Sequence, residues 1–155
     1  MEYRGLVNSF VQWCKQNHLL LNITKTKEML VDFRKKGSPA LSPVSIEGED
    51  VEVVQSYKYL GVQLDNKLDW SGNTDVLYKK GQSRLYFLRR LSSFGVCRTL
   101  LNMFYQSVVA STILYAVVCW GGSIKEGDRK RLNRLITKAA SVLGYHLGYC
   151  GGGGQ

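Results

Sequence analysis

The stretch Ser56-Tyr57-Lys58-Tyr59-Leu60-Gly61-Val62-Gln63-Leu64-Asp65 separates two halves of the chain that have different sequence patterns. One helical pattern and several short strand patterns precede it. Long helical patterns and almost all of the net charge follow it. The stretch predicts a strand, because its aromatic and branched residues favour extended backbone. Gly61 interrupts the pattern, and a glycine inside a strand marks a bulge or a close approach of another backbone or a ligand. The simplest interpretation is a buried strand with a bulge.

The chain begins with the pattern of an amphipathic helix that ends near Asn17. Its polar residues share one face, and we expect the other face to pack on something apolar. The residues of that apolar face are Tyr3, Leu6, Val7, Phe10, Val11, Trp13 and Cys14.

Short elements are predicted between this helix and the central stretch. Asn22 and the threonines after it can bond to nearby backbone and so stabilise a turn. Alternation predicts a strand over residues 28–33, and a loop with both prolines follows. Residues 44–46 and 51–53 predict a hairpin, in which Gly48 supplies the turn conformation.

Three helices are predicted after residue 73. The first has an apolar arc, with Lys79, Tyr86 and Arg90 together on the opposite side. The second runs from Arg98 to about residue 118 and is apolar on most sides. The third covers about residues 127–143, after which a Gly-rich tail is expected over 145–155. The arc of the first helix consists of Leu77, Gly81, Leu85, Leu88 and Leu91. The third helix carries a basic stripe beside its apolar face, made by Lys130, Arg131, Arg134 and Lys138.

The charge of the chain is concentrated in its second half. The net charge is +9; residues 1–72 hold 9 Lys/Arg and 9 Asp/Glu, whereas residues 73–155 hold 12 Lys/Arg and 3 Asp/Glu. Such asymmetry predicts that the second half faces a polyanion. The alternative is a basic surface that serves only solubility.

Several other classes of protein are disfavoured. The four cysteines lie far apart without a Cys-x-x-Cys pair, so neither a zinc finger nor a disulfide framework is indicated, and reduced thiols fit an intracellular protein, nuclear or cytoplasmic. The N-terminus has no apolar signal-peptide core. Residues 99–124 carry no charge and are long enough to cross a bilayer. Polar side chains dilute this segment, so we expect the core helix of the second half and no membrane partner.

The residues alone show no active site. No Asp-Asp pair lies on an apolar hairpin, where it could hold two Mg²⁺ ions. His18 and His146 lack the converging carboxylate of a non-haem iron site. Neither a phosphate-binding Walker loop nor a nucleophile elbow occurs.

Four short motifs in order resemble one family, the reverse transcriptases of non-LTR (LINE-like) retrotransposons. Leu20-Leu21-Asn22-Ile23-Thr24-Lys25-Thr26-Lys27 is similar to the fourth motif of the polymerase palm, and Tyr57-Lys58-Tyr59-Leu60-Gly61-Val62 to its primer grip. Arg84-Leu85-Tyr86-Phe87-Leu88-Arg89-Arg90-Leu91 and Ala116-Val117-Val118-Cys119-Trp120-Gly121 resemble the helical region that follows. The resemblance covers about residues 2–144.

The resemblance implies an α+β fold. A palm remnant, a helix plus short antiparallel strands, would occupy residues 1–72, and an all-α thumb-like bundle residues 73–144. The family's metal-binding Tyr-x-Asp-Asp motif is absent. The chain is therefore expected to be a fragment that is not an enzyme and has no cofactor, although the intact polymerase uses Mg²⁺.

The resemblance also implies roles for single residues. Lys25 matches the lysine thought to donate a proton to the leaving pyrophosphate, although a solvated loop lysine is the alternative. Tyr59, Leu60 and Gly61 match the primer grip. The resemblance implies that these three residues contact an RNA/DNA template-primer together with Lys79, Tyr86, Arg90 and the basic stripe of the third helix. No small-molecule substrate is expected. The oligomeric state stays open.

Two other interpretations compete with this one. Residues 10–35 also resemble the N-terminal segment of the alkylated DNA repair protein AlkB homologue 8, which would imply no dioxygenase activity here. The third possibility is a structural or interaction protein without a nucleic-acid role. Salt-dependent binding of nucleic acid would separate the third interpretation from the first.

Overall fold

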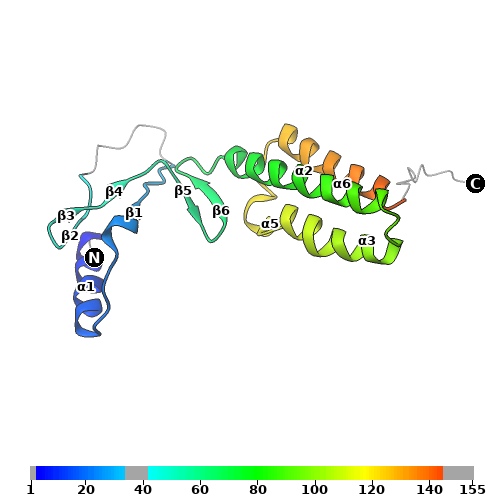
Figure 1. Ribbon diagram of the computed structural model, residues 1–155. Coiled ribbons are helices and arrows are strands. Elements are labelled where there is room, and N and C mark those ends of the chain that lie inside the picture. The colour runs from blue at the N-terminus through cyan, green and yellow to red at the C-terminus, as the bar shows by residue number, and fades with distance from the viewer. Residues whose placement is uncertain (1–2, 34–41, 145–155) are drawn as a thin grey trace, which may run out of the picture. The chain divides into compact units, whose positions relative to one another are not determined.

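The computed structural model describes residues 3–33 and 42–144, and the chain divides into two compact units after Leu68. Figure 1 shows the elements of each unit. The fold is α+β-like and mostly helical, with short two-stranded sheets.

The first unit contains helix α1 (Tyr3–Gln16) and a small core. The helix stops where His18 takes a positive φ of 56°, and the amide of Leu19 donates to the carbonyl of Cys14 at 2.9 Å. Val11 packs with Val44, Ile46 and Val51, and three half-buried residues surround them: Val7, Leu21 and Ile23. The predicted apolar face of α1 is only partly covered, because Tyr3, Leu6, Phe10 and Trp13 are at least half exposed.

The predicted turn around Asn22 is confirmed. Asn22 caps a 3-10 turn, η1 (Ile23–Lys25), by accepting the amide of Lys25 at 3.1 Å and the hydroxyl of Thr24 at 2.8 Å. The hydroxyl of Thr26 donates to the Asn22 carbonyl at 2.9 Å. These bonds fix the backbone just before the next strand.

That strand is shorter than predicted. β1 (Lys27–Glu28) pairs with β4 (Glu52–Val53), and their pairing is parallel, whereas the sequence predicted antiparallel strands. The prediction that the strand continues to Phe33 is wrong. Beyond Glu28 no described strand lies beside the chain to continue the ladder, and Phe33 is 80% exposed.

The predicted hairpin around Gly48 exists with a tighter turn. β2 (Ser45–Ile46) pairs with β3 (Glu49–Asp50), and Ile46 lies opposite Glu49. Glu47 and Gly48 have φ of 55° and 87°, as a two-residue type I′ turn requires. The second strand therefore begins at Glu49, not at Val51 as predicted.

The central stretch is also a hairpin, so the prediction of one buried strand with a bulge is wrong. β5 (Ser56–Tyr59) pairs antiparallel with β6 (Val62–Asp65), and Tyr59 lies opposite Val62. Leu60 and Gly61 form the turn with φ of 46° and 88°. A glycine interrupting a strand pattern fits the second position of such a turn as well as a bulge. The strand β5 is exposed along its whole length.

The second unit is helical. α2 (Ser71–Ser93) packs against α6 (Glu126–Val142), which runs in the same direction, and α3 (Arg98–Phe104) runs back along α2 (Figure 1). α3 continues into the π-helical segment η2 (Tyr105–Ala110) and α4 (Ser111–Ile113). α5 (Val117–Trp120) leads to the turn before α6. The predicted arc of α2 is confirmed, because all its members except the half-buried Leu91 are buried.

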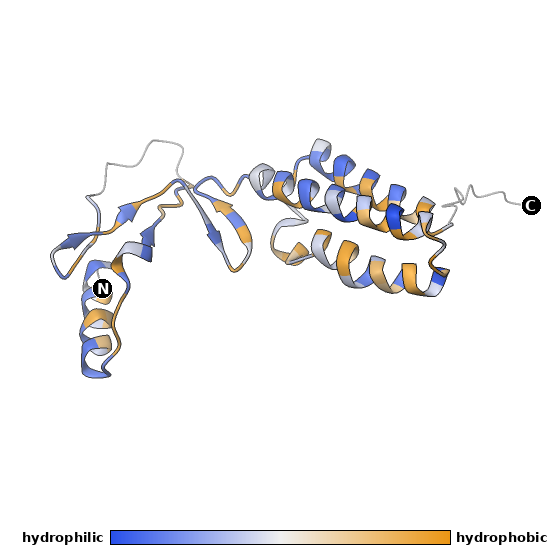
Figure 2. Ribbon diagram, viewed as in Figure 1, coloured by the Kyte–Doolittle hydropathy of each residue, from blue (hydrophilic) through white to orange (hydrophobic). Residues whose placement is uncertain are grey.

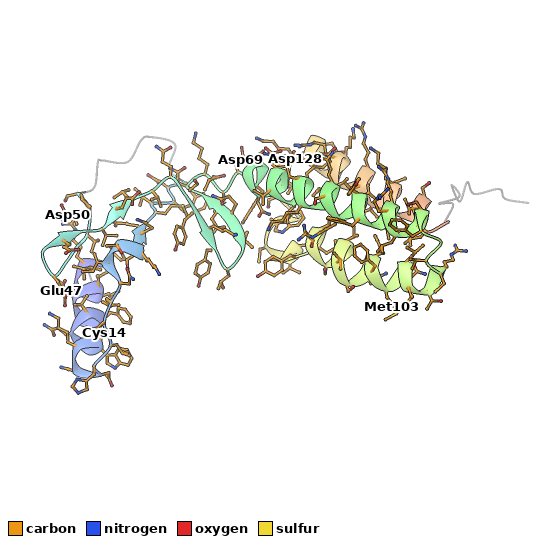
Figure 3. The ribbon with its side chains drawn as sticks, in the orientation of Figure 1. Cys14, Glu47, Asp50, Asp69, Met103 and Asp128 are labelled. Carbon is orange, nitrogen blue, oxygen red and sulfur yellow. The ribbon has the colours of Figure 1, made fainter. Side chains whose placement is uncertain are left out.

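The predicted core helix is buried on one side only. Arg98–Trp120 is long and apolar enough to cross a membrane, yet only 22% of its most apolar window is buried. Figure 2 shows the apolar residues along this segment, and Figure 3 shows Met103 pointing outward from α3. The helix is also broken after Ile113, where Ala116 takes a φ of 51°, and Val118 is 93% exposed. The segment therefore contributes buried residues to the core, as predicted, but most of its apolar surface is not buried.

Candidate nucleic-acid interface

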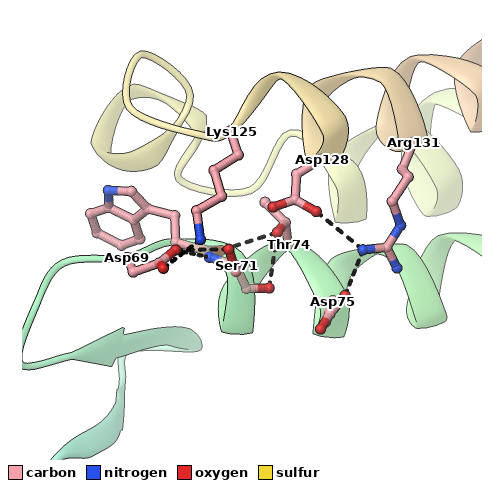
Figure 4. A network of polar contacts seen from close by, with 8 residues as sticks. Asp69, Ser71, Thr74, Asp75, Lys125, Asp128 and Arg131 are labelled. Carbon is pink, nitrogen blue, oxygen red and sulfur yellow. Dashed lines mark hydrogen bonds and ion pairs between the residues drawn. The ribbon is translucent and has the colours of Figure 1, made fainter.

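The carboxylates of the second unit gather where α2 and α6 begin. Asp69 accepts the amide and the hydroxyl of Ser71 at 3.1 and 2.7 Å, and the ammonium of Lys125 at 2.6 Å (Figure 4). The hydrogen bond from Lys125, followed by those from Ser71, holds the pKa of Asp69 well below its ordinary range. This network joins the start of α2 to the start of α6.

Arg131 lies at the same end and is held by the protein itself. Its guanidinium donates to Asp75 at 2.7 Å and to Asp128 at 3.1 Å, and lies over the ring of Tyr78 at 4.5 Å. The hydrogen bond to Asp75 is the main cause that raises the pKa of Arg131. Arg131 was predicted to contact nucleic acid, and in this structure it joins α6 to α2.

The other cations of the predicted stripe are more available. Lys130 lies 3.7 Å from Glu126, which also pairs with Arg129. Arg134 and Lys138 are exposed and form no ion pair with any described residue. Because these two lie one helical turn apart, they present two unpaired cations on one face of α6.

The middle of the second unit contains no acid at all. Residues 76–124 carry six cations and no Asp or Glu. Lys79 and Arg90, both predicted as contacts, are exposed on α2, as is Arg89. The acidic and the unpaired basic side chains are thus separated along the helix axes, because the acids cluster near the first turns of α2 and α6.

A groove lies between α2 and the α3–η2 segment, with a volume of about 580 Å³. Four aromatic residues line it, Tyr86, Phe87, Phe94 and Phe104, together with Arg84 and Arg90. Tyr86 and Phe87 touch edge to face at 5.6 Å, and Arg90 lies 5.1 Å from the centre of the Phe94 ring.

Sequence reasoning found Tyr86 and Arg90 and missed the other lining residues of this groove. Phe94 was not among the predicted contacts. The signal that could have found it is its spacing, because Phe87, Arg90 and Phe94 follow one another at about one turn on the same side of α2. Phe104 lies on another element, so no local pattern on α2 could reveal it.

The remaining predicted site residues lie in the first unit. Lys25 is exposed in η1. Tyr59, Leu60 and Gly61 form the tip of the β5–β6 hairpin, where Leu60 is 72% exposed. The tip is thus an accessible protrusion of its unit.

Among residues 3–33 and 42–144, no group of three His, Cys, Asp or Glu side chains is placed to hold a metal ion. Cys14, Cys97 and Cys119 are free thiols, the first buried and the others exposed. His146, Cys150 and the Gly-rich tail lie outside the described residues.

Three known proteins of Drosophila melanogaster are similar to most of this chain. The probable RNA-directed DNA polymerase from transposon BS is 29% identical over 90% of the chain, and the chain covers 16% of that protein. The polymerase from the mobile element jockey is 27% identical over 88% of the chain. A probable polymerase from the transposon X-element is 25% identical over 86% of it.

The chain is distantly similar to retrotransposon reverse transcriptases. It spans only about one sixth to one seventh of the relatives' length, 16% of the first and 14% of the other two. No solved structure matches the chain.

A family model described as the N-terminal part of alkylated DNA repair protein alkB homolog 8 matches residues 70–111. This resemblance was expected at residues 10–35, and that position is wrong. The match falls on α2, α3 and η2, the elements that form the aromatic groove. It covers less than a third of the chain.

Proposed function

We propose that this chain is the end of the palm and the thumb-like part of a retrotransposon RNA-directed DNA polymerase, and that its second unit binds nucleic acid without catalysing a reaction. The similarity to such polymerases over 86–90% of the chain supports this proposal. So does the order of the four motifs, which extends across both units. The partner would be an RNA/DNA template-primer in the nucleus or cytoplasm.

One observation carries the binding proposal, the separation of charge in the second unit. Residues 69–144 hold 12 Lys/Arg and 4 Asp/Glu, a net charge of +8. All four acids lie near the beginnings of α2 and α6, where they hydrogen-bond or pair with cations. A nucleic acid that contacts the remaining cations releases the counterions of its phosphates, which drives binding without regard to base sequence.

The cations differ in how freely they can contact phosphate. Arg134 and Lys138 need break no ion pair, and Lys79 and Arg90 are exposed on α2. To contact phosphate, Lys130 would have to give up its contact with Glu126 at 3.7 Å. Arg131 would have to leave the carboxylates of Asp75 and Asp128 and the ring of Tyr78. We therefore expect Arg134 and Lys138 to contribute more than Arg131.

In the first unit, we propose that the exposed tip of the β5–β6 hairpin binds the primer. Tyr59, Leu60 and Gly61 would contact the primer end, and the lack of a side chain on Gly61 would let the backbone approach closely. Lys25 would act as the proton donor in the complete polymerase.

The test is the salt dependence of binding to a single-stranded RNA. If about four phosphates are neutralised, the logarithm of affinity should fall with the logarithm of salt with a slope near −3, from roughly −0.7 per contact. Changing Arg134→Gln and Lys138→Gln together should make the slope shallower by about 1.4.

The control changes two exposed lysines of the first unit, Lys15→Gln and Lys67→Gln, of which Lys15 pairs with Glu47 at 3.0 Å. It removes the same charge and should leave the slope nearly unchanged. If both double variants weaken binding equally, the basic surface serves only solubility, and the interpretation as an interaction protein replaces this one.

A further inference from the structure

The aromatic groove combines exposed aromatic rings with two arginines. A ligand that uses both features is flat and carries negative charge. Phe87 and Phe94 are more than half exposed, the latter by 71%, so their faces are accessible. They lie seven residues apart, about 10 Å along the helix axis. Flat rings can therefore enter between them over the open side of the groove.

The opposite wall is unusual in its backbone. Phe104 and Val108 come from the junction of α3 with η2, a π-helical segment of six residues. The hydroxyls of Ser107 and Ser111 donate to the carbonyls of Met103 and Ser107 at 2.7 and 2.5 Å, a type of bond that often accompanies bends in helices. π-helical turns within α-helices are frequent at functional sites.

The charge of the groove selects the class of ligand. Arg84 and Arg90 line it, and residues 76–124 contribute no acid to oppose them. An apolar peptide would use the rings and bring no negative charge to Arg84 and Arg90, whose guanidiniums contact only the Lys80 carbonyl and the Phe94 ring among the interactions of the described residues. An anion with exposed π faces uses both.

We propose that this groove binds the unpaired bases of a single-stranded nucleic acid, with Arg84 and Arg90 on the flanking phosphates. The inference rests on the proposed function and narrows it, because a duplex hides the base faces that the rings of Phe87 and Phe94 would stack on. Stacking of this kind tolerates any base sequence, because every base has a π face.

The test compares three twelve-nucleotide probes binding to the full chain: an oligouridine RNA strand, its duplex with oligoadenosine, and an abasic strand that keeps the phosphates. Phe87→Leu and Phe94→Leu, changed together, keep apolar side chains and remove two rings. This variant should lose at least about 30-fold in affinity for the RNA strand, because each of the two lost base–aromatic stacks usually contributes about 5- to 160-fold. Its affinity for the abasic strand should not change.

The control variant changes another exposed pair of rings. Phe10 and Trp13 stack at 6.0 Å on α1 in the first unit, and both are about half exposed. Phe10→Leu with Trp13→Leu should bind the RNA strand as the unchanged chain does. Photocrosslinking of 5-iodouridine RNA to the unchanged chain gives a second measurement that needs no variant, and the crosslinks should map to Phe87 or Phe94.

Three outcomes would overturn the inference. If all three probes bind equally with a steep salt dependence, phosphate binding stands and the groove has no role. If the Phe87→Leu/Phe94→Leu variant abolishes a self-association of the chain and not RNA binding, a second copy occupies the groove. If no probe binds, the proposed function falls together with this inference.

Discussion

Asp69 shows how a single side chain can fix the beginning of a helix and join it to another. Its carboxylate receives three hydrogen bonds, two from Ser71 at the start of α2 and one from Lys125 just before α6. Each bond favours the ionised form, which is why the pKa of Asp69 falls. Substitution here would therefore act on two helices at once.

The pH dependence of stability should report this network. Because the pKa of Asp69 is lower when the chain is folded than the ordinary value of 3.8, its contribution is fully present above that value. It is lost as the pH falls below 3.8 toward the folded pKa. Chemical denaturation followed by helical circular dichroism should find Asp69→Asn less stable than the unchanged chain at pH 7, with the gap closing below pH 3.8.

The comparison variant for this measurement is Asp50→Asn, an exposed carboxylate in β3 of the first unit. It should leave the helical transition unchanged. A gap between Asp69→Asn and the unchanged chain that stays constant down to pH 2 would show that the lost stability does not come from ionisation.

At the scale of elements, the contact between α2 and α6 depends on a glycine, Gly81, which has no side chain. A Cβ placed on Gly81 would lie 2.8 Å from a terminal carbon of Leu135 and 3.4 Å from Ile113. Both neighbours are almost fully buried, so neither can move aside into open space. Gly81 therefore sets how closely the two helices approach.

Gly81→Ala should destabilise the chain by about 1–3 kcal/mol, the usual cost of overpacking a core. Gly127→Ala is the matched control, because a Cβ at that helical position meets nothing within 4 Å. The control should gain up to about 1 kcal/mol from the higher helix propensity of alanine. Thermal unfolding of the two variants measures the difference, and equal midpoints would mean that α6 shifts to accommodate the methyl group.

Sequence periodicity predicted the helices better than the strands, for a physical reason. The arc from Leu77 to Leu88 repeats over several turns of α2, so each turn supports the same interpretation. The turn at Leu60 and Gly61 is marked by one glycine, and leucine gives no sign of a positive φ. A leucine and a glycine inside a strand pattern therefore look the same in the sequence whether they form a hairpin turn or a bulge.

The candidate site was predicted only in part, since contacts between distant elements leave no local pattern. The spacing of Arg134 and Lys138 placed them on one face of α6. Nothing in the sequence near Arg131 shows that Asp75 lies within hydrogen-bonding distance, because 56 residues separate them. The same holds for Phe104, which meets α2 across the groove.

For the whole molecule, we expect from the proposed function that this chain alone does not polymerise nucleotides. Two-metal phosphoryl transfer needs carboxylates that hold Mg²⁺ between the reacting oxygens. The sequence lacks the Tyr-x-Asp-Asp motif that supplies them in the family it resembles. Primer extension on an RNA template with purified protein and Mg²⁺ should therefore stay at the level without protein. Extension that disappears in the Lys25→Ala variant would overturn the proposed function.

The parallel arrangement of α2 and α6 has a consequence for the approach of a ligand. The N-terminal end of each helix carries partial positive charge, and the acids of the second unit lie there, opposite in sign. Unpaired cations lie farther along both helices, so the side chains form an electric dipole of their own. In the field of a polyanion this dipole experiences a torque that turns the cationic end forward before contact. The bias acts within about 10 Å at 0.1 M salt, the distance over which the field is screened.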